Sequence, residues 1–431
     1  MKVIKKQSES LYKIVVSHYL FSALCFVMLS LMLFTSVAEL SGHYFNPKIL
    51  AITHMAALGW GTTIVFGASY QLIPVVFEKD LYSYKLPWIS FITFIAGLIL
   101  LVCSFWTFDP GICMQLGSLL LLFSIILFAL VVILTARANK KEASIQQEFM
   151  VTSTLWLLGT ALLGVLLVFN FRFAFLPKDH LHFLKLHAHM GIAGWFLLLI
   201  IGVSSKLIPM FLVSRKTNDK LLSWCYYLLN GALILFLVDT YIYGINTKTF
   251  LIVLVLVAGI LLYLKYVFDC FRSRIKQHIE LPITNTIISL GLMVAGVFVL
   301  PLIIYYQLKQ DPQSVHYTTL YGSLLFMGWI SSLILGQAFK TLPFIVWASK
   351  YEHLAGKSKT PLPADLYSKP LLQVQTVLFV AFCLAFYLGY SLKLEILMSA
   401  GIGCLILTAF VYLVNLLKVL WHKTRVNSVV E

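Results

Sequence analysis

Charged residues are scarce in this chain: only 11% of its 431 residues are Asp, Glu, Lys or Arg, whereas 60% are hydrophobic. A soluble globular domain carries about 25% charged residues, so this composition excludes a soluble fold. None of the seven cysteines forms a Cys-x-x-Cys pair, which argues against a disulfide framework and against a zinc or iron–sulfur site. The chain also lacks a phosphate-binding loop, a His-Glu-x-x-His motif and a nucleophile elbow.

Long apolar runs are what the sequence has in abundance. Twelve segments of about 20 residues are long enough to cross a bilayer. They are centred near residues 27, 62, 95, 124, 159, 198, 232, 258, 293, 330, 380 and 408. The first segment is too long for a removable signal peptide and has no clear cleavage site, so we count it as a membrane helix. We therefore predict an all-α polytopic membrane protein, with a single transmembrane domain over residues 1–431.

The positions of the basic residues predict the orientation of the chain. The formal net charge is +15, but Lys and Arg are concentrated near both termini and in the loops after the fourth, sixth, eighth and tenth segments. This alternation is typical of a membrane protein with cytoplasmic basic loops, so no nucleic-acid partner is expected. We predict an integral protein of the plasma (inner) membrane, surrounded by the lipid bilayer, with cytoplasmic N- and C-termini.

One pattern occurs three times, in the second, sixth and tenth segments. Relative to a position zero it has Gly-Trp at five and six residues, Gly at thirteen and Pro at twenty. The copies are Gly59, Trp60, Gly67 and Pro74 after His54; Gly194, Trp195, Gly202 and Pro209 after His189; and Gly328, Trp329, Gly336 and Pro343 after Ser323. The pattern predicts three pseudo-symmetric four-helix units, approximately residues 11–140, 145–275 and 280–420. Glycines in membrane helices usually allow close packing, so the repeat bears more directly on architecture than on chemistry.

Histidine occupies position zero in two of the three copies. An intramembrane histidine is costly and usually faces the interior of the helix bundle. If the units are related by rotation about the membrane normal, His54 and His189 lie at equal depth. Neutral imidazole is a common axial ligand of haem iron, so the pair predicts a six-coordinate haem. The alternative is a pair of hydrogen-bonded histidines in a packed interior.

Further candidate ligands cluster around the same segment. His187 lies two residues before His189, about 200° away around the helix, and could hold a second haem or metal; it could also be a structural histidine near the membrane surface. His182 and His316 each lie seven residues before position zero and could form a copper site or be interfacial histidines. Arg172 and Lys185 could pair with haem propionates, or belong to a solvated basic cluster.

The run "HAHMGIAGW" followed by "GVSSKLIP" resembles the haem-ligating helix of haem-copper oxidase catalytic subunits, especially C-family oxidases and nitric oxide reductases. "GASYQLIP", residues 67–74, is similar to the end of their second helix. The resemblance covers nearly the whole chain and implies twelve helices in three arcs. It also implies haem b, with His187 ligating a high-spin haem and His189 and His54 ligating a low-spin haem.

The sequence departs from that family in three respects. The His-x-His motif lies in the sixth segment and not the tenth, which has Tyr321 and Ser323 at the corresponding places. The family's copper site needs an adjacent His-His pair, and this chain has none. The apolar segments contain almost no carboxylates in their interiors, so a conventional proton pump is not expected.

The sequence therefore predicts a haem-binding membrane protein in electron transfer or in nitric oxide or oxygen chemistry, without the standard copper centre. As an oxidoreductase it would take electrons from a cytochrome or a quinol; whether it is an enzyme stays open. A second interpretation is an NnrS-type protein, which carries haem and copper and is linked to nitric oxide stress. A third is a non-enzymatic haem or metal carrier or a transporter; a transporter would have broken helices with polar residues at mid-depth, whereas these segments are mostly uninterrupted there.

Overall fold

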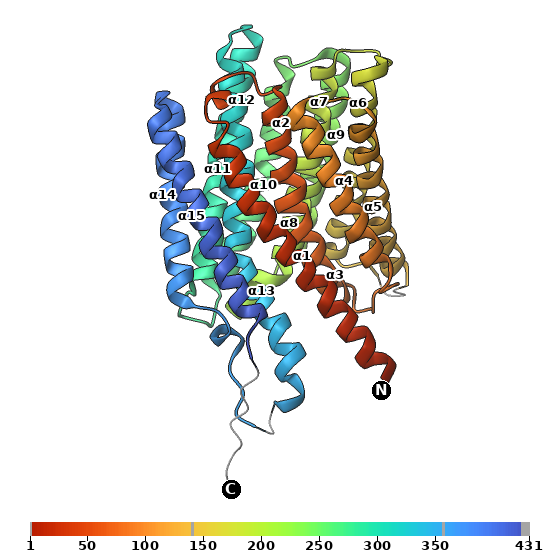
Figure 1. Cartoon of the computed structure of the whole chain (residues 1–431), viewed down its shortest axis with the longest axis vertical. Helices are drawn as coiled ribbons and strands as arrows, with labels where there is room; N and C mark the ends of the chain where they lie inside the picture. The colour runs from red at the N-terminus through yellow and green to blue at the C-terminus, as the bar shows by residue number, and fades with distance from the viewer. Residues whose placement is uncertain (1, 139–141, 356–357, 424–431) are drawn as a thin grey trace. The chain divides into compact units, whose positions relative to one another are not determined.

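The computed structural model describes residues 2–138, 142–355 and 358–423, and within them it consists of helices joined by loops (Figure 1). The described residues form 12 helical spans that are long and apolar enough to cross a membrane. They contain no β-strand, only an isolated bridge between Ser214 and Arg274. The prediction of an all-α, twelve-span membrane protein is confirmed.

Most spans are single helices. These are α1 (Lys2–Phe34), α4 (Leu86–Thr107), α5 (Ile112–Arg137), α6 (Ile145–Phe173), α9 (Asp219–Tyr243), α10 (Lys248–Arg272), α11 (Leu281–Leu308), α14 (Lys369–Leu392) and α15 (Glu395–Leu420). Short 3₁₀ turns lie in the loops at Ala38–Ser41, Glu352–Leu354 and Pro363–Asp365. Polar side chains cap several helix starts, since Asn46, Ser144, Asp179 and Asn218 each accept a backbone N–H of the first turn.

The three spans of the sequence repeat differ from the others because each contains a π-helical segment. They are α2 (Pro47–His54), η2 (Met55–Thr62) and α3 (Thr63–Phe77); α7 (His180–His189), η3 (Met190–Leu197) and α8 (Leu198–Leu212); and α12 (Gln313–Ser323), η4 (Leu324–Ile330) and α13 (Ser331–Tyr351). Each π segment begins directly after position zero of the repeat. Such segments are rare in helices and are frequent at functional sites.

Hydroxyl groups stabilise the widened backbone of two of these segments. The side chain of Thr63 donates to the carbonyl of Leu58 at 3.0 Å, and that of Ser331 donates to the carbonyl of Phe326 at 2.8 Å. In both cases the acceptor lies five residues earlier, which is the spacing of a π turn. A buried carbonyl needs a partner, so these hydroxyls help to explain how the irregular backbone is tolerated inside the span.

The repeated glycines allow the preceding helix to pack closely. A Cβ atom on Gly59, Gly194 or Gly328 would lie against Cys25, Trp156 or Leu292, and one on Gly67, Gly202 or Gly336 would lie against His18, Phe149 or Asn285. The two contacted residues are seven apart in all three preceding helices, α1, α6 and α11. The glycine pattern therefore has one physical cause, close antiparallel packing of two helices in each copy.

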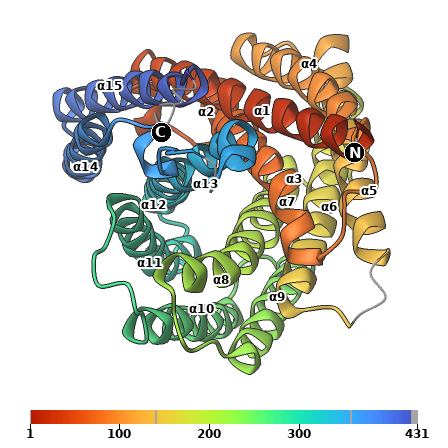
Figure 2. The same cartoon turned by 90° about the horizontal axis from the view of Figure 1, so that it is seen from below.

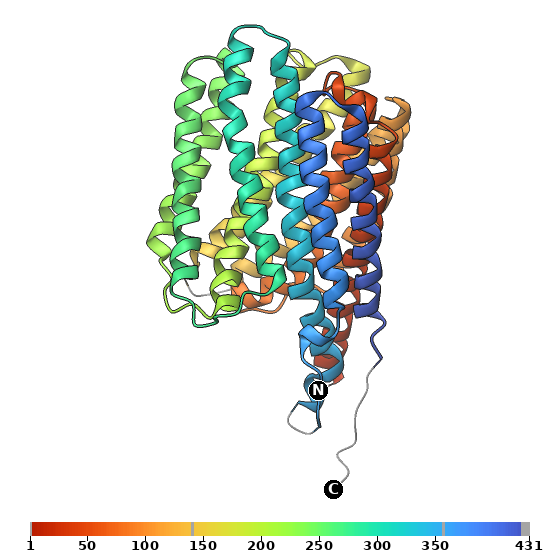
Figure 3. The same cartoon turned by 90° about the vertical axis from the view of Figure 1, so that its left-hand side faces the viewer.

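The described residues form two compact units. The terminal unit comprises Met1–Gln71, Ile279–Gly296 and Thr318–Glu431, and the central unit comprises Leu72–His278 and Val297–Tyr317. In the terminal unit α14 packs along α15 (Figure 3), and α1 packs against α15 and η2. In the central unit α9 packs along α10, and α6 packs against α5 and α8 (Figure 2).

The compact units do not coincide with the predicted repeats. Helices α4 and α5, the predicted last helices of the first repeat, pack in the central unit, where α5 contacts α6. The predicted boundary at residue 140 lies outside the described residues. The single domain and its repeat boundaries stay predictions. The start of α1 and the end of α15 lie at the same end of the terminal unit (Figure 1), as an even number of spans requires; their cytoplasmic location stays a prediction.

Candidate haem ligands and their surroundings

His54 is the last residue of α2 and directly precedes η2. Its ring nitrogen Nδ1 lies 2.7 Å from the carbonyl oxygen of Leu50, one turn earlier in the same helix. A carbonyl only accepts hydrogen bonds, so Nδ1 carries a proton, and in the neutral ring Nε2 carries the lone pair. This is the tautomer that ligation of a metal through Nε2 needs, with Nδ1 held by a backbone acceptor.

His189 has the same local geometry in the central unit. It is the last residue of α7, it directly precedes η3, and its Nδ1 donates to the carbonyl of Lys185 at 2.8 Å. Its ring centroid lies 4.4 Å from that of Phe236 in α9. The residues at both positions therefore fit axial ligation of haem through Nε2.

The third copy of the repeat has no imidazole at this place. Ser323 donates to the carbonyl of Leu320 at 2.8 Å, and the hydroxyl of Tyr387 in α14 donates to the carbonyl of Ser323 at 3.0 Å. The Tyr387 hydroxyl also lies 3.0 Å from where a Cβ on Gly328 would be. A tyrosine from α14 thus packs against position zero, and this copy offers no haem ligand there.

His187 is oriented by a different helix from His189. Its Nδ1 donates to the backbone carbonyl of Thr160 in α6 at 3.0 Å. A Cβ on Gly164, one turn further along α6, would lie 3.0 Å from His187 Cε1, so a larger residue there would crowd the ring. The two imidazoles contact α6 and α9 respectively, in keeping with the 200° separation that their spacing predicts. The sequence did not identify Thr160 and Gly164 as neighbours of a candidate ligand. Their spacing of four residues indicates only that they share one face of α6.

The two candidate partners of haem propionates differ in their surroundings. Lys185 is half-buried and lies one turn before His189, whose ring bonds to its carbonyl. Arg172 is exposed at the end of α6, with its guanidinium 5.8 Å from the centroid of the Phe173 ring. Of the two, Lys185 lies beside a candidate haem ligand.

The predicted copper ligands His182 and His316 each pack against a tyrosine ring. The His182 ring meets Tyr241 edge-on with the centroids 5.9 Å apart, and the His316 ring meets Tyr317 at 5.5 Å. Across residues 2–138, 142–355 and 358–423, no three His, Cys, Asp or Glu side chains gather closely enough to hold a metal ion. The copper site stays a prediction.

Comparison with known proteins places this geometry in a known fold. No protein-family model and no curated protein matches the sequence. Among solved structures, the chain resembles a heme-copper terminal oxidase dimer studied by cryo-EM, with a TM-score of 0.68 and 13% sequence identity. The similarity covers 96% of this chain and 85% of that chain. The chain therefore has a haem-copper oxidase fold, in agreement with the resemblance of its sequence motifs.

Proposed function

We propose that this protein is a haem-binding membrane oxidoreductase, with haem b held by His54 and His189. The main support is that the two histidines share one local geometry. Each is the last residue of an α-helical segment before a π segment, and each has Nδ1 bonded to the carbonyl four residues earlier. Two ligands with the same tautomer and the same backbone context favour a six-coordinate, electron-transferring haem. The likeness to a haem-copper terminal oxidase supports the class of chemistry.

The surrounding residues would orient the ligands and neutralise the cofactor. The carbonyls of Leu50 and Lys185 fix the ring tautomers, and Phe236 packs beside the His189 ring. The Lys185 ammonium is the candidate partner for a propionate, and Arg172 is a second candidate further along the surface. When bound, the haem iron would supply a centre that accepts and donates one electron.

His187 is the candidate ligand of a second haem that takes up nitric oxide or oxygen. Its Nδ1 is held by Thr160, so Nε2 is again the ligating nitrogen. The electron donor in this proposal is a cytochrome or a quinol, and the protein acts in the plasma (inner) membrane with both termini cytoplasmic. The proposal includes no copper step, because no described cluster of side chains supports one.

The third repeat favours a second candidate function, a non-respiratory haem protein of the NnrS type linked to nitric oxide stress. Ser323 and Tyr387 occupy the place where the oxidase-like pattern requires a histidine in the tenth span. A haem carrier without turnover is the remaining alternative. Both candidates share the bis-histidine haem with the oxidoreductase proposal and differ from it in catalysis.

The reduced-minus-oxidised absorption spectrum of the purified protein tests this proposal, with pyridine extraction to identify the haem. We expect a six-coordinate b-type spectrum that is lost in both His54→Ala and His189→Ala. The exposed His353, in the loop after α13, provides the matched control, and His353→Ala should keep the spectrum. An unchanged spectrum in either ligand variant contradicts the bis-histidine site.

Turnover separates the enzyme from the carrier. With an added electron donor, steady consumption of nitric oxide or oxygen supports the oxidoreductase, and haem binding without consumption supports the carrier. Loss of consumption in His187→Ala, with the six-coordinate spectrum retained, would assign His187 to the gas-binding site.

A further inference from the structure

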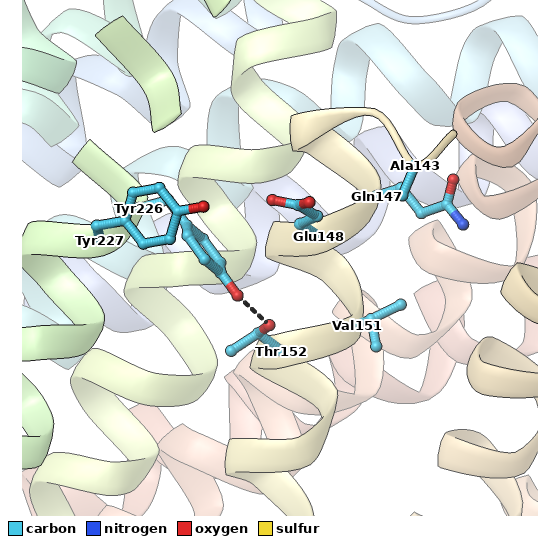
Figure 4. A pocket seen from close by; sticks show the side chains of 7 residues that line it. All are labelled: Ala143, Gln147, Glu148, Val151, Thr152, Tyr226 and Tyr227. Carbon is cyan, nitrogen blue, oxygen red and sulfur yellow. Dashed lines mark hydrogen bonds between the residues drawn. The ribbon is translucent and has the colours of Figure 1, made fainter. Parts of the chain in front are cut away.

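An open pocket lies between the first turns of α6 and the facing part of α9 (Figure 4). Its volume is about 360 Å³, and it is lined by Ala143, Gln147, Glu148, Val151, Thr152, Tyr226 and Tyr227. The hydroxyls of Thr152 and Tyr226 are 2.7 Å apart and join the two helices. Both helices begin at this end of the central unit, so the pocket lies near one surface of the predicted membrane.

The pocket combines a carboxylate with aromatic rings. The side chain of Glu148 points into it beside Tyr226 and Tyr227 (Figure 4), and no ion pair forms at this carboxylate among the described residues. A carboxylate attracts a cation, and tyrosine rings attract cations through their faces. The hydroxyls of Thr152 and Tyr226 add hydrogen-bonding groups. Such a lining favours an ammonium group.

The internal repeat provides a control for this set of side chains. Trp156 of α6, Cys25 of α1 and Leu292 of α11 are equivalent, because each contacts the first repeated glycine of its own copy. In that register Glu148 corresponds to Ser17 and Thr284, and Thr152 corresponds to Phe21 and Ile288. The architecture therefore does not require a carboxylate at the first position or a hydroxyl at the second, and the second repeat alone combines the two.

The surface next to the pocket suits a membrane lipid better than a soluble amine. Lys220, Trp224 and Tyr227 share one face of α9, and Trp224 and Tyr227 are 66% and 62% exposed. Exposed Trp and Tyr are typical of the membrane–water interface, and a nearby lysine can contact a lipid phosphate. Beyond them α9 presents the exposed apolar side chains of Ile234, Leu235 and Val238, against which an acyl chain can lie.

We propose that this pocket binds the headgroup of a phosphatidylethanolamine-type lipid. The ammonium group lies between Glu148 and the two tyrosine rings, the phosphate contacts Lys220, and the acyl chains follow the exposed face of α9. Two observations support this assignment. The charges of the pocket and the headgroup are complementary, and on α9 a lysine and two aromatic residues are followed by exposed apolar side chains. It is independent of haem binding and of the proposed function.

Thermal unfolding in nanodiscs tests the proposal. In wild-type protein, we expect replacing part of a phosphatidylglycerol bilayer by phosphatidylethanolamine to raise the unfolding temperature by about 2 °C or more, because ligand binding to the folded state stabilises it. Glu148→Gln should abolish this rise. The matched control is Glu395→Gln, which makes the same change in the first turn of α15, at an exposed site outside the pocket, and should keep the rise.

Native mass spectrometry of detergent-purified protein provides a second readout that does not depend on stability. Retention of added phosphatidylethanolamine should fall about tenfold in Glu148→Gln and in Tyr227→Leu, an exposed position where substitution leaves the core intact. Equal effects of both lipids on wild type, or an unchanged phosphatidylethanolamine effect in Glu148→Gln, would overturn the proposal. An equal shift with ethanolamine alone in lipid-free detergent would assign the pocket to a soluble amine and overturn the lipid assignment.

Discussion

The ring of His187 in α7 donates its Nδ1 hydrogen bond to the backbone carbonyl of Thr160 in α6, at 3.0 Å. His54 and His189 instead bond to carbonyls of their own helices. The hydrogen bond of His187 therefore depends on how α6 and α7 pack, whereas those of the other two rings follow from local helix geometry. Two imidazoles in one helix are thus controlled separately, as two distinct sites require.

Replacing Gly164 should disturb His187 selectively. In Gly164→Ala the new methyl group would lie 3.0 Å from His187 Cε1, tighter than an ordinary contact, so the ring or α6 must shift. We expect carbon monoxide binding to the reduced protein to weaken by about tenfold, while the bis-histidine spectrum stays the same. Absorption titration measures both in one sample.

Gly231→Ala in α9 is the matched control, because a Cβ at Gly231 meets no atom within 4 Å. It should leave carbon monoxide binding at the wild-type level. Identical binding in the two glycine variants would show that His187 does not serve a gas-binding site.

The sequence was sufficient for the membrane fold because that fold follows from composition. Inside a bilayer the backbone N–H and C=O groups of an apolar run must bond to each other, which a helix achieves. The sequence has twelve such runs, and the described residues form 12 such spans. The glycine register was also readable, since the preceding helix approaches Gly202 and its counterparts too closely for a side chain. Each of these features is a property of residue types at fixed spacing.

The local geometry around the histidines was not readable from the sequence. A π segment adds one residue to a turn without changing hydropathy, so nothing in residues 190–197 distinguishes η3 from a regular helix. The acceptor for His187 is the backbone carbonyl of Thr160. Every residue has such a carbonyl, so no residue type in the sequence identifies this acceptor. The packing of α4 and α5 in the central unit depends on contacts between distant segments. Haem ligation by His54 and His189 stays a prediction.

The repeated tryptophans should differ in their contribution to stability. Trp60 is fully buried, stacks on Phe26 with the centroids 4.3 Å apart, and donates through Nε1 to Ser331 at 3.0 Å. Trp60→Phe loses that bond and some packing, which should lower the free energy of unfolding by about 1–3 kcal/mol.

Trp329 is the internal comparison, because it is equally buried but its Nε1 has no hydrogen-bond partner in the described part of the chain. Trp329→Phe removes an unsatisfied donor, so we expect a smaller loss than for Trp60→Phe. Denaturant unfolding of the two variants in the same detergent gives the comparison. A larger loss for Trp329→Phe would contradict this account of the repeat.

The ion pair between Lys340 in α13 and Glu280, just before α11, should show strong coupling. The two side chains are only 15% and 26% exposed. Lys340→Met removes the ammonium group beside a partly buried carboxylate and should destabilise the protein by about 2–4 kcal/mol. The double variant Lys340→Met with Glu280→Gln should recover most of that loss.

A double-mutant cycle of unfolding free energies measures this coupling. The exposed pair of Lys265 and Asp269 in α10, at 60% and 38% exposure, is the control and should show a coupling of less than about 1 kcal/mol. Equal coupling in the two pairs would mean that burial does not strengthen the Lys340 contact.

The loop after α1 should confer a pH dependence on stability through Glu39. The hydrogen bond from Lys48 holds the pKa of this carboxyl below its ordinary value of 4.5. A lowered pKa in the folded state means that the contribution is complete above pH 4.5 and is lost as the pH falls through the folded value. Glu39→Gln should therefore unfold at a lower temperature than wild type at pH 7, and the two melting temperatures should converge as the pH is lowered well below 4.5. Glu395→Gln, whose carboxylate forms no ion pair among the described residues, should follow the wild-type curve at both pH values. A constant difference between Glu39→Gln and wild type across this range would mean that the loop is stabilised by the shape of the side chain and not by its charge.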